Sequence, residues 1–337
     1  MNRNNFDALR LFAAGLVLVG HSHALLGLRE PLFLSWLPLG PLGVYIFFTI
    51  SGYLISESWD RDPHLLRYFW RRALRIFPGL AVCVLLSILV LGPVMTTLPT
   101  REYFANPRTW EYLQNIGLYI IYYLPGVFEH LRVPNAVNGS LWSLPVEFLM
   151  YIVLALLGLA RANRWIFLLT ALAFAWFAAT WAMRTDRMLV VYNFDLRQAF
   201  LCGTYFWMGA VFYKFQLWRY FSLSGTLLVF VALLCLEPWP HFLHFAGWLL
   251  LAFLVLSFGS AYSPLLGRLT RSGDYSYGLY IYAFPIQQSL AYLLPQLDFR
   301  LYLLICALAT LTLAVGSWHL VEKRALTFKP VRPRAAS

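Results

Sequence analysis

The apolar stretch at residues 6–27 carries ionisable side chains that could do chemistry. Arg10 and His21 are eleven residues apart, so on an α-helix they share one face, about 16 Å apart along the axis. His23 falls on another face, and Asp7, three residues before Arg10, can hold the guanidinium. Ionisable residues inside an apolar helix are costly and are by default functional candidates. Because imidazole is a common general base, His21 and Arg10 are candidate catalytic residues; a hydrogen-bonded structural histidine is the alternative.

A carboxylate, Glu147, lies in a second apolar stretch, SLWSLPVEFLMY. Ser140, Ser143 and Glu147 follow an i, i+3, i+7 course and form one polar stripe on an otherwise apolar helix. Counted from opposite ends of their helices, Glu147 lies about 13 Å deep and His21 about 20 Å deep. We therefore expect the two side chains to meet, with the carboxylate orienting the imidazole as a further catalytic residue.

Five arginines lie between residues 61 and 75, in an expected inner loop that contains RYFWRRALRIFP. Arg72 and Arg75 are three apart and would form a fork on one helical face. Arginine pairs bind phosphates bidentately, so the fork is a candidate site for a phosphate-bearing cofactor. Topology setting and lipid-headgroup binding explain the arginines equally well. Just before them, Ser51 and Gly52 are small residues that let a ligand or a neighbouring helix approach closely.

A late segment, SGDYSYGLYIYAFPIQQ, places further polar side chains at membrane depth. Tyr280 and Gln287, together with Ser140 and Ser143, are consistent with a pocket for a sugar or an acyl group. An aromatic belt at the membrane interface explains the tyrosines as well.

The elements that position these residues must lie in a membrane. The 337-residue chain is 60% hydrophobic and only 12% charged, whereas soluble proteins average about 45–50% apolar and about 25% charged residues. A spanning helix needs about 20 mostly apolar residues, so the sequence predicts an all-α polytopic membrane protein of about ten transmembrane helices. An aromatic, polar stretch at 110–128 is expected at an interface or re-entering the membrane. The predicted spans are 7–28, 38–58, 77–98, 138–160, 164–183, 195–215, 223–239, 242–262, 275–295 and 300–321.

Lysine and arginine are distributed unevenly between the predicted loops. With both termini in the cytoplasm, 18 lie on the inner side and 8 on the outer side, which is the positive-inside pattern. This accounts for the net charge of +11 without a nucleic-acid partner, which would need basic residues clustered on one exposed domain. The four cysteines lie in apolar runs without a C-x-x-C pair, so neither a metal site nor a disulfide framework is expected.

Five segments occur in order along the chain: FDALRLFAAGLVLVGHS, GVYIFFTISGYLI, RRALRIFP, SLWSLPVEF and YSYGLYIYAFP. Together they resemble the acyltransferase-3 family of integral membrane acyltransferases, and the members that O-acetylate bacterial polysaccharides. The resemblance covers essentially the whole chain. It implies one acyltransferase domain over 1–337, with a short basic cytoplasmic tail at 322–337, in a bacterial inner membrane.

The resemblance also assigns residues. Arg10 and His21 match the family's essential arginine and histidine, and Glu147 matches its acidic residue. Arg72 and Arg75 match its R-x-x-R. Many members have a histidine before the aromatic-Pro pair of the late helix, and Ala283 stands there in this chain, so a late catalytic histidine is not expected.

The resulting hypothesis is O-acetyl transfer. It implies acetyl-CoA, or another acyl-CoA, as co-substrate on Arg72 and Arg75, with Ser51 and Gly52 beside it. His21 would act on the hydroxyl of an extracytoplasmic polysaccharide, such as an exopolysaccharide, or of a glycolipid, either as a general base or through a covalent acyl-histidine intermediate. Glu147 would orient His21 or contact the acceptor, and Arg10 would hold the donor or stabilise charge at the reacting centre. Membrane lipids are the only other expected partners. The acceptor-binding candidates are Ser140, Ser143, Tyr280 and Gln287.

Two alternatives belong to other classes of protein. In a transporter or flippase for a lipid-linked sugar, the intramembrane Arg, His and Glu would form a substrate path or a proton relay. A non-catalytic subunit of a polysaccharide export machine is the other. Against a transporter, no paired broken helices are visible in the two halves of the sequence.

Overall fold

The structure is a computed structural model that describes residues 4–330. Within that range it is mainly helical, with two short hairpins, β1–β2 (Leu32–Phe33, Leu37–Pro38) and β3–β4 (Val190–Val191, Phe194–Asp195). The α-helices are α1 Phe6–Leu26, α2 Leu39–Arg61, α3 Leu65–Leu86, α4 Gly92–Met95, α5 Thr100–Ala105, α6 Pro107–Glu111, α7 Ser143–Leu159, α8 Arg164–Phe177, α9 Leu196–Lys214, α10 Leu223–Leu236, α11 Pro240–Ser260, α12 Pro264–Leu269, α13 Ser276–Leu293, α14 Phe299–Ser317 and α15 Lys323–Leu326.

Seven helical stretches of the described chain are long and apolar enough to cross a membrane. They confirm an all-α polytopic membrane protein. Helices α9, α10 and α13 occupy the three remaining predicted positions, but α10 has only 14 residues, fewer than a span normally needs. The count of ten spans and the cytoplasmic placement of the termini therefore remain predictions. The seven stretches are Phe6–Leu26, Leu39–Arg61, Leu65–Met95, Gly139–Leu159, Arg164–Ala182, His241–Ser260 and Phe299–Leu326.

The arginine-rich segment is helical rather than the expected loop. Helix α3 begins at Leu65, twelve residues before the predicted start of this span, and the His64 side chain caps it by accepting a hydrogen bond from the Arg67 backbone N–H. Hydropathy places the apolar part correctly, but leucine, arginine and alanine all favour helix and extend it beyond the apolar region. The fork formed by Arg72 and Arg75 therefore lies on a real helical face.

The stretch at 110–128 is mostly not helical. A 3-10 helix, η2 (Tyr112–Gly117), ends at Leu118 in the left-handed conformation, and the chain to residue 128 has no regular structure. The Asn115 side chain accepts a hydrogen bond from the Ile121 N–H and donates one to the Ile121 carbonyl, so it replaces a helical ladder. Non-helical backbone at membrane depth is tolerated where protein buries it.

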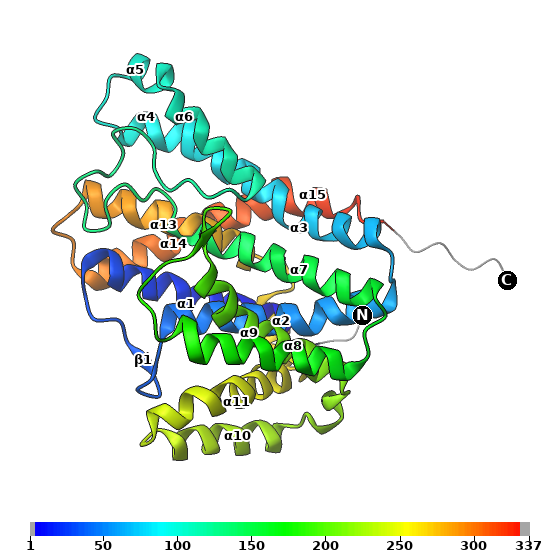
Figure 1. The fold of residues 1–337 in the computed structure, drawn as a ribbon. Coiled ribbons are helices and arrows are strands. Elements are labelled where there is room, and N and C mark those ends of the chain that lie inside the picture. The colour runs from blue at the N-terminus through cyan, green and yellow to red at the C-terminus, as the bar shows by residue number, and fades with distance from the viewer. Residues whose placement is uncertain (1–3, 331–337) are drawn as a thin grey trace.

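Close packing around α1 and α2 positions the site. Helix α1 packs against α2 and α13, and α2 packs against α9 (Figure 1). Gly43 lets α2 approach α1, because a Cβ there would overlap the Ala13 carbonyl oxygen. Gly52 does the same against α9, where a Cβ would overlap the Phe206 carbonyl oxygen. Such small-residue contacts are typical of membrane helix pairs.

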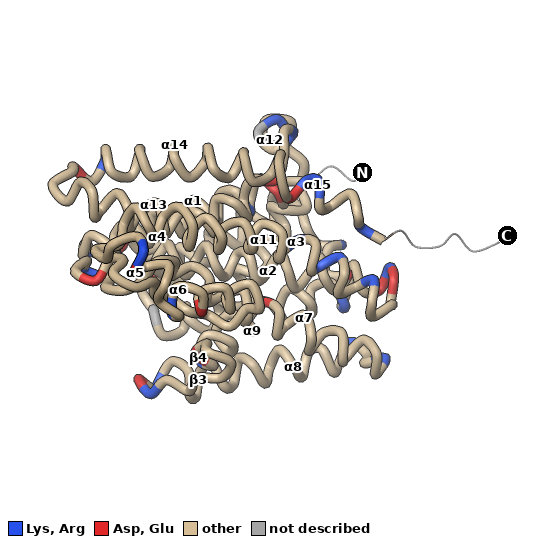
Figure 2. Tube along the Cα trace, turned by 90° about the horizontal axis from the view of Figure 1, so that it is seen from above, with Lys and Arg blue, Asp and Glu red and all other residues tan. Residues whose placement is uncertain are grey.

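The charges lie mainly at the two ends of the helices, and the middle of the bundle carries few (Figure 2). The beginning and the end of the described chain lie toward the same side, where lysines and arginines gather at the ends of α3, α8 and α15.

Candidate active site

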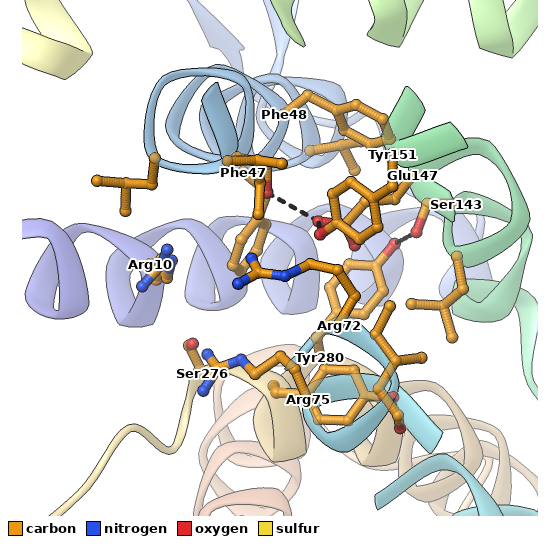
Figure 3. A pocket seen from close by; sticks show the side chains of 17 residues that line it. Arg10, Phe47, Phe48, Arg72, Arg75, Ser143, Glu147, Tyr151, Ser276 and Tyr280 are labelled. Atoms are coloured by element: carbon orange, nitrogen blue, oxygen red, sulfur yellow. Dashed lines mark hydrogen bonds between the residues drawn. The ribbon is translucent and has the colours of Figure 1, made fainter. Parts of the chain in front are cut away.

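A cavity in the half of the bundle where α1 begins gathers most of the predicted site residues (Figure 3). We call it the arginine pocket. Side chains from α1, α2, α3, α7 and α13 line it, and Figure 3 shows its guanidinium groups converging. The predicted residues that line the pocket are Arg10, Ser51, Arg72, Arg75, Ser143, Glu147 and Tyr280.

Asp274, just before α13, connects two of the pocket arginines. Its Oδ2 accepts a hydrogen bond from Arg75 at 2.5 Å and lies 4.0 Å from Arg10 Nη1. Arg10 also donates to Asp7 at 3.1 Å, as the i, i+3 spacing predicted. Burial alone would raise the pKa of Asp274, but the charges of Arg75 and Arg10 and the hydrogen bonds from Ser276 and Arg75 hold that pKa well below its usual value. The carboxylate is therefore ionised and fixes both guanidinium groups.

Arg72 differs from its neighbours because it makes no ion pair within the described chain. Its guanidinium carbon lies 6.0 Å from the centre of the Tyr151 ring, and its buried Nε has no hydrogen-bond partner. A buried cation without a counter-charge is unfavourable. The pocket is thus prepared for an anionic ligand at Arg72.

The other arginines of this segment are neutralised elsewhere. Arg67 and Arg71 donate to Asp62 at 2.6 and 2.8 Å, and Arg61 donates to Glu57 at 2.7 Å. The pKa of Asp62 is lowered, first by the hydrogen bond from Arg67 and then by the hydrogen bond from Arg71 and the positive charges of both arginines. Of the five arginines, only Arg72 and Arg75 line the pocket, so a purely topological role suits the other three better.

The end of the described chain adds a cation beside the pocket. Helix α15 packs on α3, and Trp70 Nε1 donates to the Phe328 carbonyl at 3.2 Å. The next residue is Lys329, whose pKa is lowered by burial and by the positive charges of the pocket arginines and Arg71. Its ammonium therefore lies within electrostatic reach of the arginine pocket.

Glu147 forms one wall of the arginine pocket. Its Oε1 accepts hydrogen bonds from Ser51 Oγ at 2.8 Å and from Tyr151 at 2.5 Å. Nearby, the Ser143 and Tyr280 hydroxyl oxygens are hydrogen-bonded at 2.6 Å, and Tyr280 donates to the Ser140 carbonyl at 3.0 Å. Two members of the predicted polar stripe, Ser143 and Glu147, therefore lie on α7 and connect it with α13 and α2. The third, Ser140, precedes α7 in the 3-10 helix η3 (Gly139–Trp142).

His21 lines a different cavity, which we call the histidine cavity. Residues near the end of α1 and the starts of α2, α7 and α9 line it, so it lies toward the other end of the bundle. The His21 ring contacts Phe284 edge-on at 5.2 Å, and its Nδ1 has no hydrogen-bond partner within the described chain. Glu30 lines the same cavity and accepts a hydrogen bond from the Gly40 N–H at 2.6 Å. Other residues that line it are Gly20, Ala24, Tyr45, Trp142, Gln198 and Leu201.

Two residues, Val44 and Tyr280, line both cavities. We call them the partition. The arginine pocket and the histidine cavity therefore adjoin each other, and these two side chains lie at the boundary between them. The Tyr280 hydroxyl is held by hydrogen bonds to Ser143, the first residue of α7, and to the Ser140 carbonyl just before it.

The expected meeting of Glu147 with His21 was wrong. Depth along two helices does not decide which faces meet, and Val44 and Tyr280 stand between the two cavities. His21 lines a cavity, but not the one that Arg10 lines, although their shared face on α1 favoured a common site. His23 packs on Phe299, and its Nδ1 is hydrogen-bonded to the Val19 carbonyl.

Three predicted site residues line neither cavity. Gly52 is buried against the α9 backbone. Gln287 is buried and donates to the Leu18 carbonyl at 2.7 Å and to Ser22 Oγ at 2.6 Å, which ties α13 to α1. Ser140 is buried as well, and its carbonyl accepts from Tyr280.

Three site residues were missed. Tyr151 lies one helical turn after Glu147, a spacing that could have indicated it. Asp274 stands two residues before the start of α13, and an acidic residue at that place was a usable signal. Glu30 lies between α1 and the first hairpin, where no periodicity exists to predict its partners.

No group of residues in the described part of the chain could hold a metal ion. The fold is that of a polytopic membrane protein, and its two polar cavities lie toward opposite ends of the helical bundle. A family model described as an acyltransferase domain matches residues 3–319. The chain belongs to the acyltransferase-3 family.

Similar proteins agree with this membership. An O-acetyl transferase of Shigella phage Sf6 is 33% identical over 97% of both chains. Nodulation protein 10 of Rhizobium leguminosarum bv. viciae is 31% identical over 97% of this chain and 94% of its own. The peptidoglycan O-acetyltransferase OatA of Listeria monocytogenes is 28% identical over 44% of this chain and 23% of its own. No solved structure matches. The chain is an O-acetyltransferase of the membrane.

Proposed function

We propose that the protein transfers an acetyl group from cytoplasmic acetyl-CoA to a hydroxyl of an extracytoplasmic polysaccharide or glycolipid, in a bacterial inner membrane. The observation that supports this most is the partition: an anion-binding pocket and a histidine cavity lie on its two sides. Relatives named as O-acetyl transferase and peptidoglycan O-acetyltransferase support a glycan as acceptor.

The arginine pocket suits the phosphates of coenzyme A. Arg72 is a half-buried cation without an ion-pair partner in the described chain, and Asp274 binds Arg75 and lies near Arg10 in the same pocket. The arm from the pyrophosphate to the sulphur has about thirteen bonds, the length of a little over four extended peptide residues or about 15 Å. Arg10 and His21 are about 16 Å apart along α1. A donor bound at the arginines can therefore present its thioester at the partition.

The reaction requires one proton acceptor. A ring nitrogen of His21 takes the proton of the acceptor hydroxyl as its oxygen attacks the thioester carbonyl carbon. The C–S bond then breaks, the sulphur leaves as the thiolate of coenzyme A, and the proton passes from the imidazolium to that sulphur. This is general base and then general acid catalysis by one residue. No metal takes part in this scheme.

The remaining residues have assigned roles. Arg10 binds the donor and stabilises negative charge on it. Glu147 holds the Ser51 and Tyr151 side chains in the wall of the arginine pocket, where the donor binds. Glu30, which shares the histidine cavity, takes the role first given to Glu147 and contacts the acceptor or orients His21. Trp142 and Gln198 of the same cavity supply an aromatic face and an amide for a sugar.

Transfer of label from [acetyl-14C]acetyl-CoA in inverted membrane vesicles tests the proposal. Unaltered protein should place label on a luminal glycan, and His21→Ala should abolish this while the protein remains folded in detergent. His130→Ala is the matched control, because His130 is exposed and lines neither cavity. An active His21→Ala protein would refute the assigned base. Absence of acetyl-CoA binding by the unaltered protein would refute the donor.

A further inference from the structure

A third cavity of about 570 Å³ adjoins the arginine pocket. It lies where α1 begins and where α2, α9 and α11 end, and the 3-10 helix η5 (Leu217–Tyr220) and the start of α10 close it. Leu54 lines both this cavity and the arginine pocket. On α1, Phe6 lines the cavity and Arg10 lines the pocket, only about 6 Å further along the axis. The two sites are therefore neighbours.

The lining of this cavity is aromatic. Tyr53, Tyr213, Trp218 and Phe221 all contribute to it. Their rings contact one another: Tyr53 and Tyr213 have ring centres 5.7 Å apart, and Tyr213 and Trp218 have centres 5.5 Å apart. Rings arranged around a cavity offer flat faces to a flat ligand, whereas purely interfacial anchors would face lipid.

The one carboxylate of the cavity favours a ligand that donates a hydrogen bond to it. Glu57 is its only charged lining residue within the described chain, and neither lysine nor arginine lines it. Glu57 Oε1 accepts a hydrogen bond from Arg61. A carboxylate has two oxygens and about four acceptor positions, so the group can still accept from an amine. A phosphate would be repelled, while a neutral heteroaromatic ring with an exocyclic amine is complementary.

We propose that this cavity binds the adenine ring of the acyl-CoA donor. The inference rests on the proposed function, since it takes acyl-CoA as the donor. The adenine stacks on the aromatic rings, its exocyclic amine donates to the Glu57 carboxylate, and the phosphates of the same molecule reach Arg10 and Arg72 next door. The pantetheine arm then extends in the opposite direction, toward the partition.

The test compares two donors on the purified full-length protein: acetyl-CoA and S-acetyl-4′-phosphopantetheine, which lacks the adenosine part. Stacking on one aromatic side chain is worth about ten- to a hundredfold in affinity. Trp218→Leu should therefore raise the KM for acetyl-CoA about ten- to a hundredfold and leave the KM for the fragment unchanged. Trp239→Leu, an exposed tryptophan that lines none of these cavities, is the control.

A second pair of donors tests the amine contact. A coenzyme A analogue with hypoxanthine in place of adenine replaces the amine by a carbonyl oxygen, which Glu57 would repel. The unaltered protein should prefer the adenine donor about tenfold or more, and Glu57→Gln should lose most of that preference.

Equal effects of Trp218→Leu on both donors, or no effect on either, would overturn the inference, because the tryptophan would then support the fold or contact lipid. No preference for adenine in the unaltered protein would also overturn it. Failure of the unaltered protein to use acetyl-CoA at all would refute the proposed donor, and this inference with it. Normal use of acetyl-CoA with unchanged KM in Trp218→Leu would refute the adenine site alone.

Discussion

Arg72→Ala provides the sharpest test of the arginine pocket, because Arg72 is half-buried with an unpartnered Nε and makes no ion pair within the described chain. A hydrogen bond to a charged group contributes about 1.5–3 kcal/mol. If Arg72 contacts a donor phosphate, its loss should raise the Kd for acetyl-CoA about ten- to a hundredfold. The free energy of unfolding should change little, because no ion pair is broken and an unpaired, half-buried charge is removed together with its contact to the Tyr151 ring.

Arg75→Ala should behave differently. Arg75 is bound to the buried Asp274, and removing one partner of a buried pair costs about 3–5 kcal/mol, so both affinity and thermal stability should decrease. Arg67→Ala is the charge-matched control, since Arg67 lies on the same helix but binds Asp62 outside the pocket.

Isothermal titration calorimetry with acetyl-CoA and thermal unfolding in the same detergent measure both quantities. Equal Kd values for Arg72→Ala and Arg67→Ala would refute phosphate binding at Arg72. A loss of stability in Arg72→Ala would show that an internal partner of this residue had been overlooked.

Three further predictions concern the partition residue Val44 and the carboxylates of Glu30 and Asp274. Val44→Leu adds one methylene to the partition and should slow acetyl transfer about 10- to 200-fold without changing the Kd for acetyl-CoA, whereas Val44→Ala should increase the rate with butyryl-CoA relative to acetyl-CoA; unchanged acyl preference in both would contradict the role of the partition. Glu30→Gln should lower kcat for label transfer and leave the donor Kd unchanged, and a wild-type kcat would exclude Glu30 from the acceptor side. The pKa of Asp274 is lower in the folded protein, so its ionised form stabilises the fold above the unfolded pKa of about 3.9 and this stabilisation is lost as pH falls below that value. Asp274→Asn should therefore lower Tm by a constant amount from pH 8 to 5, with the difference shrinking below about pH 4; a difference that varies between pH 8 and 5 would contradict this origin.

Helix positions were predictable because the bilayer imposes one strong rule, a run of about 20 apolar residues. Helices occur at all ten predicted positions of the described chain. The rule fails where the sequence is not apolar: α3 continues outward through an arginine-rich segment that hydropathy excludes, and residues 110–128 bond through Asn115 rather than through a helical ladder. Both exceptions depend on individual side chains.

The arginine pocket was largely predictable, because spacing on one helix defines a face. Arg72 and Arg75 are three positions apart on one helix, and so are Asp7 and Arg10. The structure keeps each pair on one helical face. Whether His21 meets Glu147 was not predictable, since it depends on how α1 and α7 are rotated about their axes. Close contacts between helices, such as that of Gly43 in α2 with the backbone of α1, help to set how the helices are rotated. The periodicity of a single helix does not encode such contacts.

The partition also explains why this arrangement suits group transfer better than transport of a whole sugar. A transporter must move its entire substrate past every barrier, and the hydrogen bonds of Tyr280 to Ser143 and to the Ser140 carbonyl oppose that. An acetyl donor needs only its two-carbon group to reach the barrier, because phosphates, nucleotide and sulphur all stay on the arginine side. The acceptor likewise brings only one hydroxyl to His21. Chemistry across such a barrier needs no continuous path for water or ions, so an immobile barrier that would block transport is compatible with acetyl transfer.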